Sequence, residues 1–283
     1  MKIVDDPAEV CSAVEQARVE GHSIGFVPTM GALHEGHATL LRHAMATNGF
    51  VVASIFVNPL QFNDPRDLAN YPTTAPQDEA LCNDLGVDLI YRPTVDHVYP
   101  PGFDTRVEPG VLAEVLEGLH RPGHFSGMAT IVLKLFNIVD PDDSYFGKKD
   151  YQQLAIVRRM VTDFNLKVRV HGIETVREPD GLAMSSRNTK LSAEARSSAT
   201  ALNAALIAVR DRLSRGADLQ EAVASQRSEL LGNPQIDLEY FEAVDSATLC
   251  PPTPNAKDLV VVVAAKVGGV RLIDNVEISL GNN

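Results

Sequence analysis

Residues 22–57 read HSIGFVPTMGALHEGHATLLRHAMATNGFVVASIFV. The apolar run at 22–28 predicts a short buried strand, and residues 35–48 have the apolar spacing of a helix. Residues 50–57 form a second apolar run, rich in β-branched side chains, that stops at Asn58-Pro59. Strand, turn, helix and strand in this order predict a βαβ unit and therefore a parallel sheet.

The alternation of helices and strands continues to about residue 176. Further helices are expected over residues 7–20, 77–85, 125–139 and 151–164, and further strands over residues 87–91, 144–147 and 167–176. We therefore expect an α/β domain over residues 1–176. It should be a Rossmann-like, mostly parallel sheet with helices on both faces, which binds ligands at the carboxyl ends of its strands.

The composition changes after Asn188. Two helices are expected over residues 192–216 and 218–232, followed by strands over 236–244, 258–267 and 269–278. Gly268-Gly269 between the last two strands is typical of a hairpin turn. Residues 177–283 are thus predicted to form a smaller C-terminal α+β lobe with a three-stranded antiparallel sheet.

The overall composition excludes several classes of protein. The chain has 283 residues, 45% of them hydrophobic, and a net charge of −12, which argues against a nucleic-acid surface. Its longest apolar run, Leu259–Ala265, is far shorter than the roughly 20 residues that span a bilayer. The polar start is unlike a signal peptide. Cys11, Cys82 and Cys250 have no disulfide or zinc spacing, so we expect a cytoplasmic protein with reduced thiols.

The first stretch that suggests chemistry is His34-Glu35-Gly36-His37, at the predicted start of a helix. A helix N-terminus presents unpaired N–H groups that suit a phosphate, and imidazoles can donate hydrogen bonds to phosphate oxygens as a P–O bond breaks. Metal binding is an alternative, although it needs a third ligand. Capping and packing of the helix could also explain the spacing.

Polar residues also follow the other predicted strands. Asn58 and Gln61 come after the strand at 50–57, where two amides could orient a carboxylate or a hydroxyl. The segment at 117–128, with Arg121 and His124, precedes a long apolar helix. Any of these loops could be polar merely because it faces water.

Two lysines open the helix predicted at 151–164. Lys148 and Lys149 are unfavourable at a helix N-terminus unless an anionic ligand or Asp150 offsets them. Farther on, Ser185-Ser186-Arg187 lies in a polar loop that could close on a polyphosphate or serve as a simple linker. No nucleophile stands beside a general base, so the expected chemistry is direct attack of a bound substrate on a nucleotide phosphate.

Five motifs occur together in this order: PTMGALHEGH, FVNPLQF, RPGHFSGM, YFGKKDYQQL and AMSSRN. As a set they strongly resemble the pantothenate synthetase (pantoate–β-alanine ligase) family over essentially the whole chain. The HxGH element is similar to the HIGH signature of the nucleotidyltransferase superfamily, and Met184-Ser185-Ser186-Arg187 to its mobile KMSKS-type loop. The resemblance implies ATP-dependent condensation of (R)-pantoate with β-alanine through a pantoyl adenylate, with release of pyrophosphate and AMP.

The resemblance also implies roles for particular residues. Catalysis is implied for His37, as proton donor, and for His34, Lys149 and Arg187. The residues implied to bind ATP are Met30, Gly31, His34, His37, Gly147, Lys149, Asp150, Val176, Met184, Ser185, Ser186 and Arg187. The residues implied to bind pantoate are Asn58, Gln61, His124 and Gln153, with Gln61 also near β-alanine. Mg²⁺ should arrive on the ATP phosphates, with Asp78 nearby, and the C-terminal lobe should act as a lid.

Two residues depart from the family pattern: Lys148 stands where Glu is usual, and Thr73 where Arg is common. The expected partners are small molecules, without nucleic acid or membrane, and the resemblance suggests a homodimer. Two alternatives are a HIGH-type nucleotidyltransferase with another acceptor and a non-catalytic nucleotide-binding protein. A nucleotidyltransferase with another acceptor would have no need for Gln61 and Gln153 around a small acid. A non-catalytic nucleotide-binding protein would have no need to retain Lys149 and Arg187.

Overall fold

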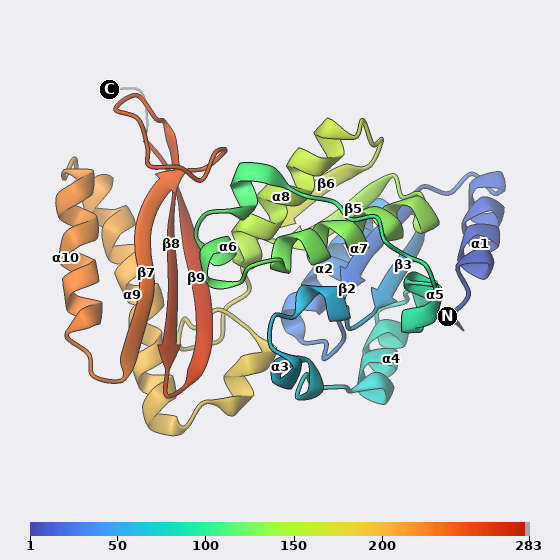
Figure 1. The fold of residues 1–283 in the computed structure, drawn as a ribbon, viewed down its shortest axis with the longest axis horizontal. Coiled ribbons are helices and arrows are strands. Elements are labelled where there is room, and N and C mark those ends of the chain that lie inside the picture. Colours follow the sequence, from blue (N-terminus) through green and yellow to red (C-terminus); the bar gives the residue numbers. More distant parts are fainter. Residues whose placement is uncertain (281–283) are drawn as a thin grey trace. The chain divides into compact units, whose positions relative to one another are not determined.

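The computed structural model describes residues 1–280, which form two compact units (Figure 1). Unit 1 comprises Met1–Lys148 and Gln152–Glu174, and unit 2 comprises Lys149–Tyr151 and the chain from Thr175 onward. A short piece of chain soon after the fifth strand thus belongs with the C-terminal unit. Among the described residues, no helix is long and apolar enough to cross a membrane.

Unit 1 is built on a six-stranded sheet in the order β1-β4-β3-β2-β5-β6, in which all neighbours pair in parallel. This confirms the parallel α/β fold expected from the sequence. The strands are β1 Lys2–Val4, β2 Ile24–Thr29, β3 Phe50–Ile55, β4 Leu89–Tyr91, β5 Asp143–Gly147 and β6 Arg169–Ile173. The first strand, β1, was not anticipated, because three residues are too few for a recognisable pattern.

The helices of unit 1 follow the expected alternation, with several short additions. The longer ones are α1 Pro7–Val19, α2 Glu35–Thr47, α4 Ala75–Asp84, α7 His124–Val139 and α8 Tyr151–Asp163. The short ones are η1 Pro59–Gln61, α3 Pro65–Ala69, α5 Val95–Val98, η2 Gly110–Ala113 and α6 Glu117–His120. A further short helix, η3 Lys148–Asp150, begins with the last residue of the first segment of unit 1 and continues into the segment that belongs to unit 2. None of the short helices was predicted, because one turn of helix carries no apolar periodicity.

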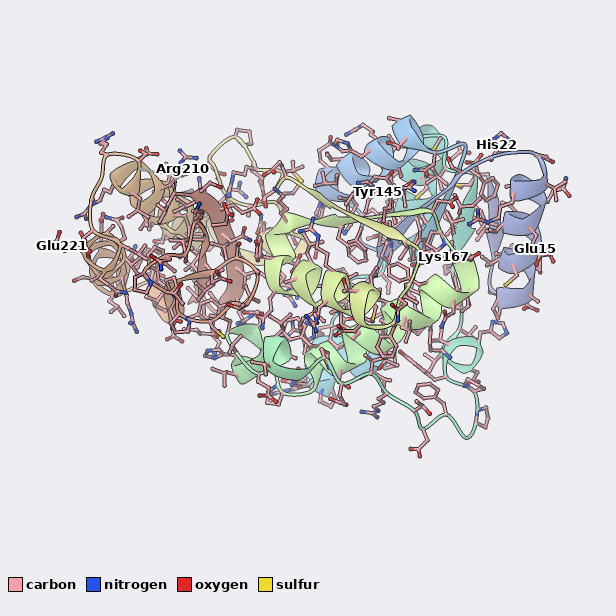
Figure 2. All side chains as sticks on the ribbon, turned by 90° about the horizontal axis from the view of Figure 1, so that it is seen from above. Glu15, His22, Tyr145, Lys167, Arg210 and Glu221 are labelled. Atoms are coloured by element: carbon pink, nitrogen blue, oxygen red, sulfur yellow. The ribbon has the colours of Figure 1, made fainter. Side chains whose placement is uncertain are left out.

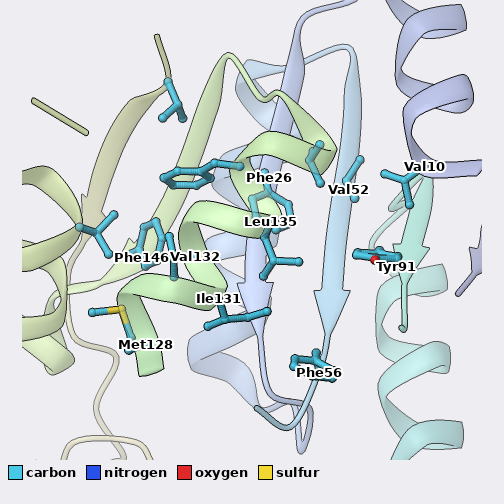
Figure 3. Close-up of a cluster of buried hydrophobic side chains, with 14 of the residues drawn as sticks. Val10, Phe26, Val52, Phe56, Tyr91, Met128, Ile131, Val132, Leu135 and Phe146 are labelled. Carbon is cyan, nitrogen blue, oxygen red and sulfur yellow. The ribbon is translucent and has the colours of Figure 1, made fainter. Parts of the chain in front are cut away.

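Both faces of the sheet are buried, as the alternation of side chains along its strands requires. Phe26 and Val52 point to the face covered by α1, α7 and α8 and belong to the same buried cluster as Val10, Met128 and Leu135 (Figure 3). Their neighbours in sequence, Val27, Val51 and Ala53, pack on the other face with Leu41 of α2 and Cys82 of α4. The sheet is therefore the middle layer of three, as expected for a doubly wound fold.

Unit 2 contains the three-stranded antiparallel sheet expected from the sequence, in the order β7-β8-β9. Its elements are η4 Ser186–Lys190, α9 Ala193–Leu213, α10 Leu219–Leu231, β7 Ile236–Asp245, β8 Asp258–Val267 and β9 Val270–Ser279. Gly268 and Gly269 both have positive φ, as a two-residue hairpin turn requires. Val261 and Val263 of β8 pack against Leu206 of α9, while charged side chains such as Arg210 and Glu221 lie at the surface (Figure 2).

Candidate active site

The predicted site residues of unit 1 follow the carboxyl ends of three neighbouring strands. Met30 and Gly31 follow β2, Asn58 lies shortly after β3, and Gly147 is the last residue of β5. The strand order reverses at β2, because β3 pairs with one of its edges and β5 with the other. In open α/β sheets, ligands bind outside the carboxyl ends at such a reversal.

The two histidines of the HxGH element cap the helix α2. His34 is its N-cap residue, and His34 Nδ1 accepts a hydrogen bond from Gly36 N at 3.1 Å. The His34 backbone N–H in turn donates to His37 Nδ1 at 3.3 Å, which completes a reciprocal capping box. The ring centroids are 4.2 Å apart. Since each Nδ1 accepts, each neutral ring carries its proton on Nε2.

The loop between β2 and α2 is held by Asp78, which lies on α4 and is only 2% exposed. Its carboxylate accepts hydrogen bonds from Ala32 N at 3.0 Å, Leu33 N at 2.8 Å and Thr74 Oγ1 at 3.0 Å. The loop needs this support, because Gly31 and Ala32 both have positive φ, which is unfavourable for alanine. Both carboxylate oxygens are thus engaged by protein donors at the place where the sequence suggested a nearby Mg²⁺.

Asn58 and Gln61 lie together after β3 with His124 from α7. Asn58 is 1% exposed and its Nδ2 donates to Gly127 O at 3.0 Å, while its Oδ1 accepts from Leu60 N at 3.3 Å. His124 Nδ1 lies 2.8 Å from Gln61 O, so it carries the proton of the neutral ring. A Cβ on Gly127 would lie 2.0 Å from the Leu60 carbonyl oxygen, so only glycine lets α7 approach this loop.

Two residues that support this cluster were not found from the sequence. Tyr99 donates its hydroxyl to Asn58 Oδ1 at 2.8 Å. Gln152, at the start of α8, accepts from Glu117 N at 3.0 Å and donates to Leu112 O and Val115 O, which fixes the segment before α7. Both partners lie more than 30 residues away in sequence, so no local pattern could indicate them. Gln152 does stand next to the predicted pantoate residue Gln153.

The lysine-rich stretch after β5 has partners for both of its cations. Lys148, the residue that stands where the family usually has Glu, pairs with Glu174 at 2.5 Å between Nζ and Oε1, so this glutamate offsets the positive charge of Lys148. Within unit 2, Lys149 Nζ lies 3.8 Å from Asp150 Oδ2, and Lys149 O accepts from Asn275 Nδ2 at 2.9 Å. The backbone of Lys149 is thus anchored by a side chain that is itself buried.

The serine-rich loop of unit 2 is a folded turn. Ser185 caps η4 by accepting from Arg187 N at 3.3 Å, and Met184 N donates to Val176 O at 2.9 Å. Asn188 Nδ2 donates to Glu178 Oε1 at 2.6 Å and to Ala183 O at 3.1 Å.

The turn is also tied to α9. Arg196 pairs with Glu178 at 2.5 Å and with Asp180 at 2.8 Å. Burial opposes ionisation of Glu178, but hydrogen bonds from Arg196 and Asn188 outweigh it and lower the pKa of this carboxyl. The structure thus gathers Val176, Met184, Ser185, Ser186 and Arg187 in one braced segment.

The chain matches the model of the pantoate-beta-alanine ligase family over residues 2–277. It belongs to this family. A pantothenate synthetase of Trichlorobacter lovleyi is 47% identical over 97% of this chain and 98% of its own length. The crystal structure of pantothenate synthetase from Thermus thermophilus has a TM-score of 0.92 and 44% identity, covering 99% of this chain and 100% of its own.

A second solved relative is the pantoate-beta-alanine ligase of Francisella tularensis, described as a complex with beta-gamma ATP and beta-alanine. Its TM-score is 0.78 at 36% identity, and the match covers 98% of this chain and 97% of that one. The family expected from the five motifs is therefore confirmed, as is the ligase activity that the family name states. The roles of the individual site residues remain predictions.

Proposed function

We propose that this ligase activates pantoate with ATP before joining it to β-alanine. In the first step a carboxylate oxygen of pantoate attacks the α-phosphorus, the bond to the β-phosphate oxygen breaks, and pyrophosphate leaves. In the second step the β-alanine amine attacks the acyl carbon, the amide forms with loss of a proton, and AMP leaves. Activation replaces a poor leaving group by a good one, so the protein needs to position reactants and stabilise charge.

The observation that carries this proposal is the capping box of His34 and His37. Because both Nδ1 atoms accept backbone hydrogen bonds, the protons of the neutral rings are on Nε2, as phosphate recognition requires. The N-terminus of α2 adds its partial positive charge at the same place. We assign ATP phosphates to this junction, next to Met30 and Gly31, with His37 as proton donor to the departing pyrophosphate.

The acid substrate is assigned to the cluster after β3. Gln61 and Gln153 would contact pantoate, Asn58 and His124 would hold the walls of its pocket, and Gln61 would also border β-alanine. These side chains are amides and an imidazole whose ring nitrogens lie close to protein groups. Such groups orient an anionic substrate without trapping it as a permanent ion pair.

Residues near the unit boundary and in unit 2 are assigned to the nucleotide. Gly147 and Asp150 would hold the ribose, Lys149 the phosphates, and the Val176 backbone the adenine, while Met184 to Arg187 would close over the phosphates as a lid. Mg²⁺ enters as part of the ATP substrate. Among residues 1–280, no group of three or more His, Cys, Asp or Glu side chains could hold a metal ion, and Mg²⁺ commonly binds through phosphates and water.

The test is exchange of labelled pyrophosphate into ATP with Mg²⁺ and pantoate present and β-alanine omitted. Exchange that requires pantoate is the expected result, because only a reversible adenylate can form ATP from pyrophosphate. ATP binding without exchange would refute the adenylate and favour another acceptor acid. We also propose that the protein acts in the cytoplasm as a homodimer; a monomeric mass in sedimentation equilibrium would contradict the dimer.

A further inference from the structure

The orientation of the Asn58 amide is fixed by two backbone groups. A backbone N–H can only donate, so the atom 3.3 Å from Leu60 N must be the Asn58 oxygen. A carbonyl can only accept, so the atom 3.0 Å from Gly127 O must be Asn58 Nδ2. The amide therefore cannot be flipped without breaking both hydrogen bonds.

This orientation determines which end of Gln61 faces the ligand side. Asn58 Nδ2 can only donate, and it lies 3.4 Å from Gln61 Oε1. The Gln61 oxygen is therefore turned toward Asn58, and Nε2 is turned away from it. Although Gln61 is only 8% exposed, no group among residues 1–280 accepts a hydrogen bond from Nε2. Gln61 Nε2 is also accessible from the solvent, because it is not among the fully buried polar atoms that lack a hydrogen-bond partner.

A nine-tenths buried amide with an unused, accessible N–H₂ group indicates a ligand atom that accepts hydrogen bonds. A carboxylate oxygen or a hydroxyl oxygen can accept, whereas an ammonium group cannot. The cluster therefore suits an oxygen atom of an acid such as pantoate.

Tyr99 completes the arrangement from the other side. Its hydroxyl is 2.8 Å from Asn58 Oδ1, and its ring packs against Phe103 at 4.8 Å and Phe56 at 6.2 Å between centroids. Burial raises the pKa of the Tyr99 phenol, which keeps the hydroxyl protonated and able to donate. Tyr99 lies 38 residues beyond Gln61 in the sequence. The hydroxyl of Tyr99 bonds to Asn58, and Asn58 in turn bonds to Gln61, so Tyr99 reaches Gln61 only through Asn58.

We propose that Tyr99 is a positioning residue that acts through Asn58 to hold Gln61 with its N–H₂ group toward the substrate carboxylate. This inference rests on the proposed reaction, because it assigns pantoate to Gln61. It predicts an effect on the substrates assigned to Gln61, chiefly pantoate, and none on ATP, since Tyr99 touches neither the HxGH junction nor the residues assigned to ATP.

The experiment compares Tyr99→Phe with Tyr91→Phe in the full-length protein. Tyr91 is a matched control, because its buried hydroxyl has no hydrogen-bond partner. Tyr99→Phe should raise the KM for pantoate about fivefold, the loss typical of one neutral hydrogen bond, with little change in kcat or in the KM for ATP. Tyr91→Phe should leave all three unchanged. Thermal unfolding of both variants verifies that each is folded.

A second comparison tests whether Tyr99 acts through Gln61. In a Gln61→Ala background, Tyr99→Phe should change kcat/KM for pantoate by no more than about twofold, because coupled residues are not additive. An undiminished effect in that background, or an unchanged pantoate KM in Tyr99→Phe alone, would overturn the relay while leaving the ligase reaction intact. Absence of pantoate-dependent exchange in the unaltered protein would overturn both.

Discussion

Replacing Asp78 by asparagine should destabilise the protein and slow adenylate formation. In the variant, the side-chain oxygen can still accept from Leu33 N and Thr74 Oγ1, which share Oδ1 in the structure. The new N–H₂ group then replaces Oδ2 and faces Ala32 N at 3.0 Å, so that two donors oppose each other. One hydrogen bond to a charged group is lost and a buried N–H is left without a partner.

The expected cost of Asp78→Asn is about 2–4 kcal/mol, because a hydrogen bond to a charged group contributes about 1.5–3 kcal/mol and an unsatisfied buried donor adds to the loss. For a chain of this size, this corresponds to a decrease in Tm of roughly 3–7 °C. Glu79→Gln is the matched control. Glu79 is the adjacent carboxylate and forms only a surface pair with Arg92, so it should cost less than about 1 kcal/mol.

The rate of pyrophosphate exchange distinguishes two roles for Asp78, as a residue that holds the loop before His34 or as a ligand of Mg²⁺. If Asp78 holds the loop before His34, Asp78→Asn should lower the rate of pyrophosphate exchange without changing the Mg²⁺ concentration that gives half-maximal rate. If Asp78 binds Mg²⁺, that concentration should rise while stability changes little. Wild-type stability together with an altered Mg²⁺ requirement would therefore refute the role of Asp78 as a brace.

Three further predictions concern other parts of the chain. His37→Ala should still bind ATP, but pantoate-dependent exchange should fall by about 10²–10³, as for loss of one group that stabilises developing charge; wild-type exchange would remove His37 from the mechanism. ATP should protect the chain around Arg187 from proteolysis, and unchanged cleavage would contradict the lid. Burial opposes ionisation of Asp143, but hydrogen bonds from Arg169 and His171 outweigh burial and lower the pKa of this carboxyl. Ionised Asp143 therefore stabilises the folded protein at pH values above the pKa that this carboxyl has in the unfolded chain. The stability gap between wild type and Asp143→Asn, followed by urea unfolding, should therefore shrink as the pH falls below about 4, and a constant gap would exclude this linkage.

The long elements were predictable because each satisfies a local rule. The strand over Phe50–Ile55 is a mostly apolar run that contains Val51, Val52 and Ile55, and the side chains after Phe50 are buried on both faces as such a run implies. The hairpin at Gly268-Gly269 follows from glycine's tolerance of positive φ. By contrast, β1 has three residues and α6 has four, so their existence depends on tertiary packing and not on their own sequence.

The motifs of the candidate site were predictable from the sequence, but the residues that hold those motifs in place were not. The HxGH element and the amides at Asn58 and Gln61 stand out because unusual polar residues follow apolar strands. Asp78 and Tyr99, which hold them, act across 46 and 41 residues of sequence. A side chain that bonds a distant backbone or amide leaves no periodic pattern, so only the folded structure reveals it.

The two explanations of the HxGH spacing, helix capping and phosphate chemistry, are compatible. Capping occupies both Nδ1 atoms with backbone N–H groups, and an imidazole whose Nδ1 accepts must carry its neutral-state proton on Nε2. The hydrogen bonds that stabilise the start of α2 therefore also select the tautomer that can donate to a phosphate oxygen. A residue that capped the helix without a second nitrogen, such as serine, would preserve the fold and lose that donor. This is why His34→Ser should lower catalysis with little loss of stability, whereas His37→Ala, which also removes the acceptor of the His34 N–H, should reduce both.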